Sequence, residues 1–322
     1  MSMHKVIYDT DPGVDDAMAL LFQVRHPDIE LLGVTTVFGN ATIEMTTRNA
    51  LYLTGKFAPH VPVARGAAAP LVREAPGPLP FIHGNNGVGD IDLPADEALG
   101  GTLDPRPAHR FIVDTVRAHP GEVTLIAVGP MTNLALALAE APEIAGLVKQ
   151  VVIMGGAFGY HGILGNVSPA AEANIFNDPH AADQIFNAAW PLTIVGLDVT
   201  ERTIMTAEYL SALRDAAGDD GQFLWDVSRV YHGFHLKSEG LDGIFVHDSS
   251  AVAFVVRPDL YTTRSGPVRV MTEGLAIGQA IQKPLTMPVP NPNWDGRPAM
   301  AVCIDVDAAG MLELYRSTLT HR

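Results

Sequence analysis

The sequence predicts one Rossmann-like α/β domain over residues 1–322, with a mainly parallel central sheet and helices on both faces. Three observations support this prediction. Short apolar runs rich in β-branched residues alternate with longer helix-compatible segments along the chain. The strand candidates are almost continuously apolar, which is typical of strands buried on both faces. No linker, low-complexity tract or internal repeat divides the chain, so one domain is the simplest organisation.

The individual elements follow from these patterns. The strand candidates, each a short apolar run, are residues 5–9, 31–37, 123–128, 151–154, 192–196, 268–272 and 299–305. The helix candidates are residues 17–25, 43–54, 108–118, 132–140, 179–188, 206–216, 221–237, 249–257 and 308–319. Residues 67–94 and 155–174 are rich in Gly or Pro and are predicted to be long loops. Ligands of parallel sheets collect outside the carboxyl ends of the strands, so we expect site residues directly after strands.

Composition narrows the class of protein. Hydrophobic residues make up 47% of the chain and charged residues 18%, which indicates a compact globular protein. The formal charge of −15 argues against a nucleic-acid backbone or an anionic membrane surface as the partner. Cys303 is the only cysteine, which excludes an intramolecular disulfide and a cysteine-based zinc site. No apolar signal segment and no apolar run of about 18 residues is found, so a cytoplasmic location is expected.

Four aspartates within eight residues form the strongest local feature. They follow the first strand candidate and precede helix candidate 17–25, and they are Asp9, Asp11, Asp15 and Asp16. Like charges this close repel by roughly 1 kcal/mol or more per pair unless a counter-charge is present. Carboxylates beside a Pro-Gly turn suit a hard cation such as Ca²⁺ or Mg²⁺. The alternative is that Asp15 and Asp16 only cap the helix and interact favourably with its dipole.

Two other segments follow strand candidates, and each has a simpler structural interpretation. Asn40 comes after residues 31–37 and is either a turn residue or a ligand contact. Strand candidate 123–128 ends at a Gly-Pro break, where a free carbonyl could meet a cation. The alternative there is an ordinary turn, with Thr132 or Asn133 capping the next helix.

Two further segments carry polar side chains of catalytic or binding type. Asn166, Glu172 and Asn174 in the second long loop offer donors and acceptors to a polyhydroxyl ligand, or form ordinary Asx turns. His247 and Asp248 precede an apolar helix candidate. The aspartate could simply cap that helix, whereas the histidine has a pKa near neutrality and could act as a general acid.

In this order, the segments resemble the nucleoside hydrolase family of the inosine–uridine type. The most specific element is the motif Asp-x-Asp-Pro-Gly-x-Asp-Asp, present as residues 9–16. The resemblance extends over nearly the whole chain. Its supporting elements are Gly39-Asn40, Gly129-Pro130 with Asn133, Met154-Gly155-Gly156, Glu172-x-Asn174 with Asp178-Pro179, and His247-Asp248.

The resemblance implies a Ca²⁺ cofactor and a reaction. Calcium would be held by Asp11, Asp16 and Asp248 and by the main-chain carbonyl of Val128. A water and two ribose hydroxyls would complete the roughly 6–8 oxygens that calcium accepts. The implied reaction is hydrolysis of the N-glycosidic bond of a ribonucleoside to free base and ribose. Calcium-bound water, deprotonated by Asp11, would attack C1′ through an oxocarbenium-like transition state, with inversion.

The resemblance also assigns substrate contacts. The groups that would hold the ribose and its 5′-hydroxyl are Asp15, Asn40, Asn166, Glu172 and Asn174. His247 would protonate or hydrogen-bond the departing base, and His83 in the first long loop is a second candidate beside the base. Tyr231 and His235 lie four residues apart on helix candidate 221–237, so they share a face that could close over the base. The alternative for these two is aromatic packing on a surface helix.

Two departures from the family pattern leave the base preference open. The family usually has an aromatic residue between the glutamate and the asparagine, where this chain has Ala173, so the pocket is expected to be roomier there. His235 stands where related pyrimidine-preferring members have a glutamine. The resemblance further implies a homo-oligomer, a dimer or a tetramer, and a role in nucleoside salvage.

Two other functions share features of this sequence. Haloacid-dehalogenase-like phosphatases also use an Asp-x-Asp pair with Mg²⁺, but Pro12-Gly13 replaces the expected hydroxyl-bearing continuation, and no basic phosphate-binding loop is found. A calcium-dependent nucleoside-binding protein without catalysis is the second alternative. The implied metal ligands, Asp11 and His247 are all present, so nothing in the sequence favours such a loss.

Overall fold

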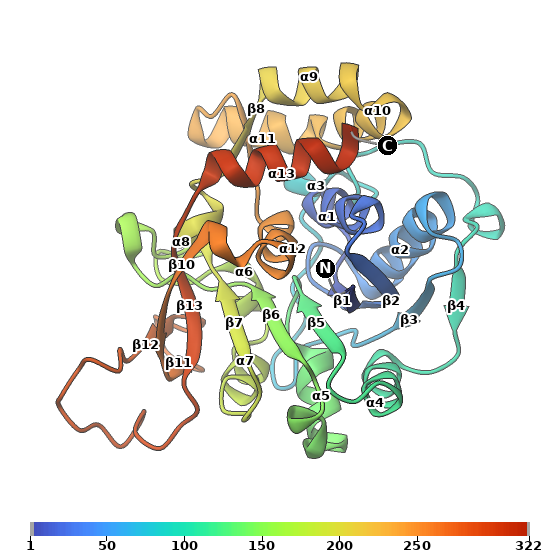
Figure 1. The fold of residues 1–322 in the computed structure, drawn as a ribbon. Coiled ribbons are helices and arrows are strands. Elements are labelled where there is room, and N and C mark those ends of the chain that lie inside the picture. The colour runs from blue at the N-terminus through green and yellow to red at the C-terminus, as the bar shows by residue number, and fades with distance from the viewer. Residues whose placement is uncertain (1–2, 321–322) are drawn as a thin grey trace.

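A nine-stranded sheet lies between two layers of helices in the computed structural model, which describes residues 3–320 (Figure 1). The strands of this sheet are β1 (His4–Thr10), β2 (Ile29–Thr36), β3 (Pro62–Arg65), β4 (Thr102–Asp104), β5 (Val123–Ala127), β6 (Gln150–Met154), β7 (Leu192–Val195), β10 (Tyr261–Gly266) and β13 (Met300–Val306). Their order is β10-β13-β7-β6-β5-β1-β2-β3-β4. Only the pair β10–β13 is antiparallel, so the prediction of a mainly parallel sheet is confirmed.

The remaining elements surround this sheet. Two small antiparallel pairs are β8 (Ile204–Thr206) with β9 (Gly243–Phe245) and β11 (Val268–Val270) with β12 (Ala280–Gln282). The α-helices are α1 (Val14–Arg25), α2 (Ile43–Phe57), α3 (Pro80–His83), α4 (Ala108–Ala118), α5 (Thr132–Glu140), α6 (Ala173–Asn177), α7 (Pro179–Ile185), α8 (Leu197–Thr200), α9 (Ala207–Ala216), α10 (Gly218–Val227), α11 (Arg229–Glu239), α12 (Asp248–Val256) and α13 (Ala308–Thr320). None of the helices described is long and apolar enough to cross a membrane.

Both faces of the sheet are buried because the strands are apolar on both sides. Along β1, Val6 and Tyr8 belong to one apolar cluster and Ile7 to the other, and all three are fully buried. The first cluster packs beneath α1, α12 and α13, and the second beneath α4, α5 and α7 (Figure 1). This arrangement explains the near-continuous apolar character of the strands. That residues 1–322 form a single domain stays a prediction.

Two predicted elements differ in the structure. Helix candidate 221–237 is wrong as one helix, because α10 ends at Val227 and α11 begins at Arg229. Between them, the hydroxyl of Ser228 donates to the carbonyl of Trp225, a local bond that competes with regular helix bonding. Strand candidate 268–272 shortens to β11, which pairs with β12 and not with the central sheet. Among the missed strands, β3, β4, β8, β9 and β12 have only three or four residues, too few for a clear period-2 pattern. Strand β10 was also missed, because its six residues are mostly polar and contain no apolar run.

The position of β1 and β5 sets the place of the site. These strands are neighbours, and the chain adds β2, β3 and β4 on one side of them and β6, β7 and β13 on the other. The strand order therefore reverses between β1 and β5. In open parallel sheets, the crevice at such a switch point, outside the carboxyl ends of the strands, is where ligands bind. The aspartate motif follows β1, and Val128 follows β5.

Candidate active site

The turn from β1 into α1 brings the second pair of aspartates back toward the strand end. The carboxylate of Asp16 accepts the Gly13 N–H at 2.9 Å and also the hydroxyl proton of Thr10. The capping interpretation therefore holds for Asp16. It does not exclude a role as ligand, because Asp16 is held in place by these bonds beside two other carboxylates.

Asp11 occupies a space that two glycines leave open. Its Oδ2 accepts the backbone N–H of Asn40 at 2.7 Å. A Cβ atom on Gly39 would lie 1.9 Å from Oδ2, and one on Gly129 would lie 2.6 Å from Oδ1. Only glycine at these two strand ends permits so close an approach. The Oδ1 atom of Asp11 is buried and has no hydrogen-bond partner among the described residues.

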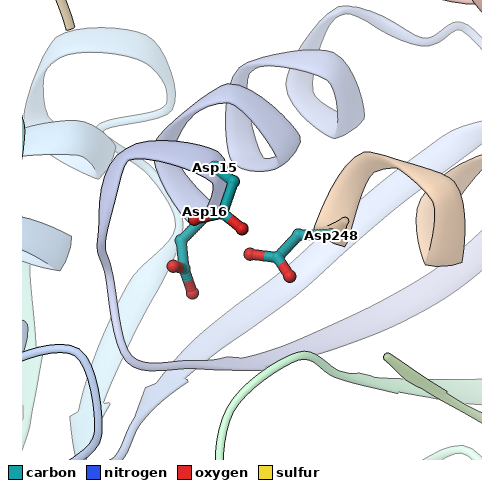
Figure 2. Close-up of side chains that lie close together, drawn as sticks. All are labelled: Asp15, Asp16 and Asp248. Carbon is teal, nitrogen blue, oxygen red and sulfur yellow. The ribbon is translucent and has the colours of Figure 1, made fainter. Parts of the chain in front are cut away.

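Three carboxylates converge above this turn. Asp15 and Asp16 project from the start of α1 and Asp248 from the start of α12, as Figure 2 shows. Each offers an oxygen, and these oxygens lie within 4.8 Å of one another. The sequence placed Asp15 among the ribose contacts, whereas this geometry makes it a further candidate ligand. Asp11 is not part of this trio, so its assignment as a ligand stays a prediction.

This cluster brings negative charges together without a positive side chain in the part of the cavity lining that the structure describes. Burial, and then the charge of Asp16, raises the pKa of Asp15 to about 8. Burial, followed by the charges of Asp15 and Asp16, holds the pKa of Asp248 well above its usual range. Among the described residues, the cavity lining contains no Lys or Arg. A divalent cation therefore fits the chemistry of this site, because it would supply the missing counter-charge to oxygen ligands.

Asp9 lies beneath the cluster and supports it. Its Oδ1 accepts the amide N–H of Asn133 at 2.8 Å and the hydroxyl of Thr35 at 2.5 Å. Asn133 also donates to the carbonyl of Thr36 and accepts the N–H of Ala67. Asn133 is therefore a link between β1, β2 and the first long loop, and it does not cap α5, which was the alternative interpretation of this segment.

The second long loop, residues 155–174, supplies another wall of the site. The carboxylate of Glu172 accepts backbone N–H groups of Gly156, Asn174 and Ile175, and so caps α6. The amide of Asn174 donates to the carbonyl of Val128 at 2.8 Å and to that of Met154 at 3.1 Å. A carbonyl oxygen has two lone pairs, so Val128 can still accept a second partner.

A group of aromatic rings forms the other end of the cavity. His83 stacks on Tyr231 with ring centroids 5.7 Å apart, and its Nδ1 accepts the N–H of Val14. Tyr231 and His235 lie on one buried face of α11, with centroids 4.3 Å apart. The Nδ1–H of His235 donates to the Tyr231 carbonyl at 2.9 Å, because a carbonyl can only accept. The Nε2 atom of His235 is therefore left as an acceptor.

His247 lies between the two ends. Its Nδ1 is 2.8 Å from the hydroxyl oxygen of Thr200. Burial, and then the neighbouring His235 and His83, lowers the pKa of His247 to about 3. The ring is therefore neutral near neutral pH. A neutral imidazole can donate a hydrogen bond from one ring nitrogen to a ligand but does not act as a charged acid.

One cavity collects most of the residues that the sequence singled out. Those lining it are Asp15, Asn40, His83, Val128, Asn166, Glu172, Asn174, Tyr231, His235, His247 and Asp248. Asp11 and Asp16 are buried next to it, in the turn below. Sequence reasoning missed Glu201, Glu239, Phe234 and Phe245, which also line the cavity. Glu201 directly follows α8, a helix of four residues that has no periodic signal.

Comparison with known proteins agrees with this geometry. A family model described as inosine-uridine preferring nucleoside hydrolase matches residues 6–313. Uridine nucleosidase 1 of Arabidopsis thaliana is 41% identical over 318 residues, which cover 98% of this chain and 93% of that protein. A plant nucleoside hydrolase has a TM-score of 0.91 at 34% identity, covering 99% of both chains. A purine-preferring ribonucleoside hydrolase from Gardnerella vaginalis has a TM-score of 0.88 at 35% identity, covering 98% of both chains.

The fold, the site and these relatives define the class of the protein as an N-glycosidase, an enzyme that cleaves a bond between a sugar and a base nitrogen. The chain belongs to the inosine-uridine preferring nucleoside hydrolase family. The family resemblance carried by residues 9–16 is thereby confirmed, and the phosphatase alternative is removed.

Proposed function

We propose that this protein hydrolyses the N-glycosidic bond of ribonucleosides to free base and ribose, with Ca²⁺ as its cofactor. The observation that carries the proposal is the buried carboxylate cluster at the switch point of the sheet, which has no basic counter-charge among the described residues. Carboxylates without partners are costly to bury unless a cation pairs with them. The cluster therefore supports an enzyme that depends on a metal.

The candidate ligands are Asp11, Asp16 and Asp248, the carbonyl of Val128, and Asp15 as an addition from the geometry. The buried Oδ1 atoms of Asp11 and Asp15 accept no hydrogen bond from the described residues, which fits oxygens that hold a cation. When bound, Ca²⁺ would lower the pKa of a coordinated water and orient the ribose hydroxyls. Five oxygen donors from the chain leave room for such small ligands within the coordination number of about 6–8.

Asp11 is our candidate for the general base. Its Oδ1 is free of hydrogen bonds, whereas its Oδ2 is fixed by the backbone of Asn40. Burial, followed by the charge of Asp16, raises the pKa of Asp11, and a bound cation would oppose that shift by stabilising the carboxylate form. A water that gives its proton to Asp11 would attack C1′ directly, so inversion is expected and no covalent sugar–enzyme intermediate is needed.

The remaining residues would hold the substrate. The proposed ribose contacts are Asp15, Asn40, Asn166, Glu172 and Asn174, which all line the cavity. Several are fixed by hydrogen bonds to the backbone, as Asn174 is by two carbonyls. Such contacts orient the sugar before reaction and so lower the barrier to attack. His83, Tyr231 and His235 would surround the base, and His247 would assist its departure.

The proposal is tested by measuring release of free base and reducing sugar. The protein is dialysed against a chelator and assayed with inosine, guanosine, adenosine, uridine and cytidine, before and after adding Ca²⁺ or Mg²⁺. We expect activity to be lost without metal, to return with Ca²⁺, and to return more weakly with Mg²⁺. The panel must include purines and pyrimidines, because one relative is named for uridine and another for purines. Base release from none of the five nucleosides would refute the proposal and favour a binding protein.

Three finer properties complete the proposal. We infer a homodimer or homotetramer, located in the cytoplasm and active in nucleoside salvage. The charge of −15 suits a soluble assembly that does not bind nucleic acid. Sedimentation velocity at micromolar concentration would show a single species of twice or four times the chain mass of 34.4 kDa if the assembly prediction is correct.

A further inference from the structure

We propose that Thr200 is a positioning residue that fixes the tautomer of His247 and so makes the Nε2–H of that ring a hydrogen-bond donor to the departing base. This inference rests on the proposed nucleoside hydrolysis. Thr200 was not singled out by the sequence, and it contributes through His247, since it does not line the cavity itself.

The contact between the two side chains is short and buried. Thr200 is the last residue of α8 and is fully buried, and His247 is 8% exposed. The distance from Thr200 Oγ1 to His247 Nδ1 is 2.8 Å. Within residues 3–320, neither the hydroxyl of Thr200 nor the ring of His247 makes another hydrogen bond. Each group is therefore the only protein partner of the other.

The direction of this hydrogen bond follows from what each atom can do. If Nδ1–H donated to Oγ1, the hydroxyl proton of Thr200 would be buried with no acceptor, which is an unfavourable state. If the hydroxyl donates to Nδ1, both atoms are satisfied. In a neutral imidazole with an unprotonated Nδ1, the proton is on Nε2. The Nε2–H then has no protein partner and is available to a ligand, because His247 lines the cavity.

The surrounding structure holds both residues in place. On α8, the carboxylate of Asp198 accepts the N–H groups of Phe158 at 2.9 Å and Tyr160 at 2.7 Å, so this short helix is tied to the second long loop. On the other side, the N–H of Val246 donates to the carbonyl of Thr203 at 2.9 Å. The segments that carry Thr200 and His247 are therefore joined next to the contact itself. A catalytic hydrogen bond needs this kind of fixed support.

A neighbouring histidine shows the opposite arrangement. His235 donates from Nδ1 to the Tyr231 carbonyl, so its Nε2 is an acceptor. His247 receives a proton at Nδ1 from Thr200, so its Nε2–H is a donor. As the C1′–N bond breaks, its electron pair moves onto the base, and the Nε2–H hydrogen bond stabilises the charge that develops there. His247 keeps its proton, and the released base takes one from water.

The first test compares Thr200→Val with Thr200→Ser on two kinds of substrate. Valine has the shape of threonine without the hydroxyl, whereas serine keeps it. Uridine and inosine need help for the leaving group, but p-nitrophenyl riboside does not, because p-nitrophenolate is stable as an anion. We expect Thr200→Val to lower kcat on the nucleosides about 10- to 100-fold, with p-nitrophenyl riboside within about threefold and KM little changed. Thr200→Ser should retain most of the nucleoside activity.

The second test measures the tautomer directly and does not depend on activity. In histidine labelled with ¹⁵N, two-bond proton–nitrogen spectra distinguish protonated from unprotonated ring nitrogens. The signals of His247 are assigned by their absence in His247→Gln. We expect Nε2 to carry the proton in the wild type and in Thr200→Ser. In Thr200→Val, we expect a mixture of tautomers or a shift of the proton to Nδ1.

The outcomes separate this inference from the proposed function. A wild-type protein that releases no base from any nucleoside would refute the proposed function, and the catalytic role of Thr200 with it. If the wild type is active, equal losses on nucleosides and p-nitrophenyl riboside would show that Thr200 is only structural. Full activity of Thr200→Val, failure of Thr200→Ser to restore it, or a wild-type proton on Nδ1 would each overturn the inference.

Discussion

The two ends of the cavity are built from different parts of the fold. The carboxylate end comes from the turn after β1 and the start of α12, at the switch point of the central sheet. The aromatic end comes from α3 and α11, which lie outside the sheet. Short hydrogen bonds to the backbone fix the first end, as between Asp11 and Asn40, whereas ring contacts hold the second. We infer that the sheet fixes the attack on the sugar and that the helices adapt the enzyme to its base.

The charge state of the two ends also differs. Burial raises the pKa of the carboxyl groups at the first end, as it does for Asp15, so they need a cation to stay ionised together. Burial lowers the pKa of His83 to about 3 at the second end, so that ring is neutral. Substitutions at the first end should therefore abolish the reaction on every substrate. Substitutions at the second end should lower the activity on some substrates more than on others.

The largest effect is expected for Asp11→Asn. Without a carboxylate, no group in this position can take the proton of the attacking water, so kcat should fall by about 10³-fold or more. The fall should be equal for uridine, inosine and p-nitrophenyl riboside, because all three need attack at C1′. Steady-state assays of base or p-nitrophenolate release measure it, with Asp92→Asn as a control on an exposed carboxylate. Activity within tenfold of the wild type would remove Asp11 from the role of general base.

A smaller and unequal effect is expected for His247→Gln. This residue would assist only the departure of the base, so kcat on nucleosides should fall about 100-fold, and that on p-nitrophenyl riboside by less than about fivefold. The ratio of the two losses is the quantity to measure. Losses of the same size on both substrates would place His247 with the carboxylate end and would remove its role in the leaving-group step.

The third effect concerns binding of the base by Tyr231. Its ring contacts both His83 and His235, while its hydroxyl makes no hydrogen bond within residues 3–320. Removing the ring in Tyr231→Leu should raise KM for nucleosides about tenfold, because an aromatic pair contributes roughly 0.5–1.5 kcal/mol beyond its buried area. Tyr231→Phe keeps the ring and should stay within about twofold. If the two variants behave alike, the contribution of this residue does not come from ring stacking.

The sequence predicted the carboxylate end of the cavity more fully than the aromatic end, for a physical reason. At the carboxylate end, the residues are contiguous in a motif after a strong apolar strand, so their meeting follows from one turn. The stacking of His83 on Tyr231 depends on how α3 and α11 pack, and no local pattern encodes that. The break at Ser228 was missed for a related reason, because the apolar pattern continues across it.

A short helix accounts for two other omissions. Thr200 and Glu201 belong to or directly follow α8, which has four residues and no room for a helical period. Their importance becomes visible only when α8 is seen beside His247 and the cavity. The role of Asp15 as a candidate ligand likewise needed the distance to Asp248, which comes from the far end of the chain.

The smallest effect concerns Glu201, an acid at the aromatic end. Burial, and then the charges of Glu239 and Asp198, raises the pKa of Glu201 to about 7 from its ordinary 4.5. The folded state therefore binds this proton more tightly than the unfolded state does. Below pH 4.5 both states are protonated and no penalty exists, but stability is lost as the pH rises through about 7.

Glu201→Gln removes this penalty, so it should raise Tm at pH 8 by about 1–3 °C and have little effect at pH 5. The gain is small because Glu201 is only partly buried, and water screens its charge. Glu208→Gln on α9 changes an exposed carboxylate and serves as the control. Added Ca²⁺ should stabilise both variants as much as the wild type, because Glu201 lies outside the proposed ligand set. A gain that disappears when calcium is added would instead mean that the two ends of the cavity share one electrostatic site.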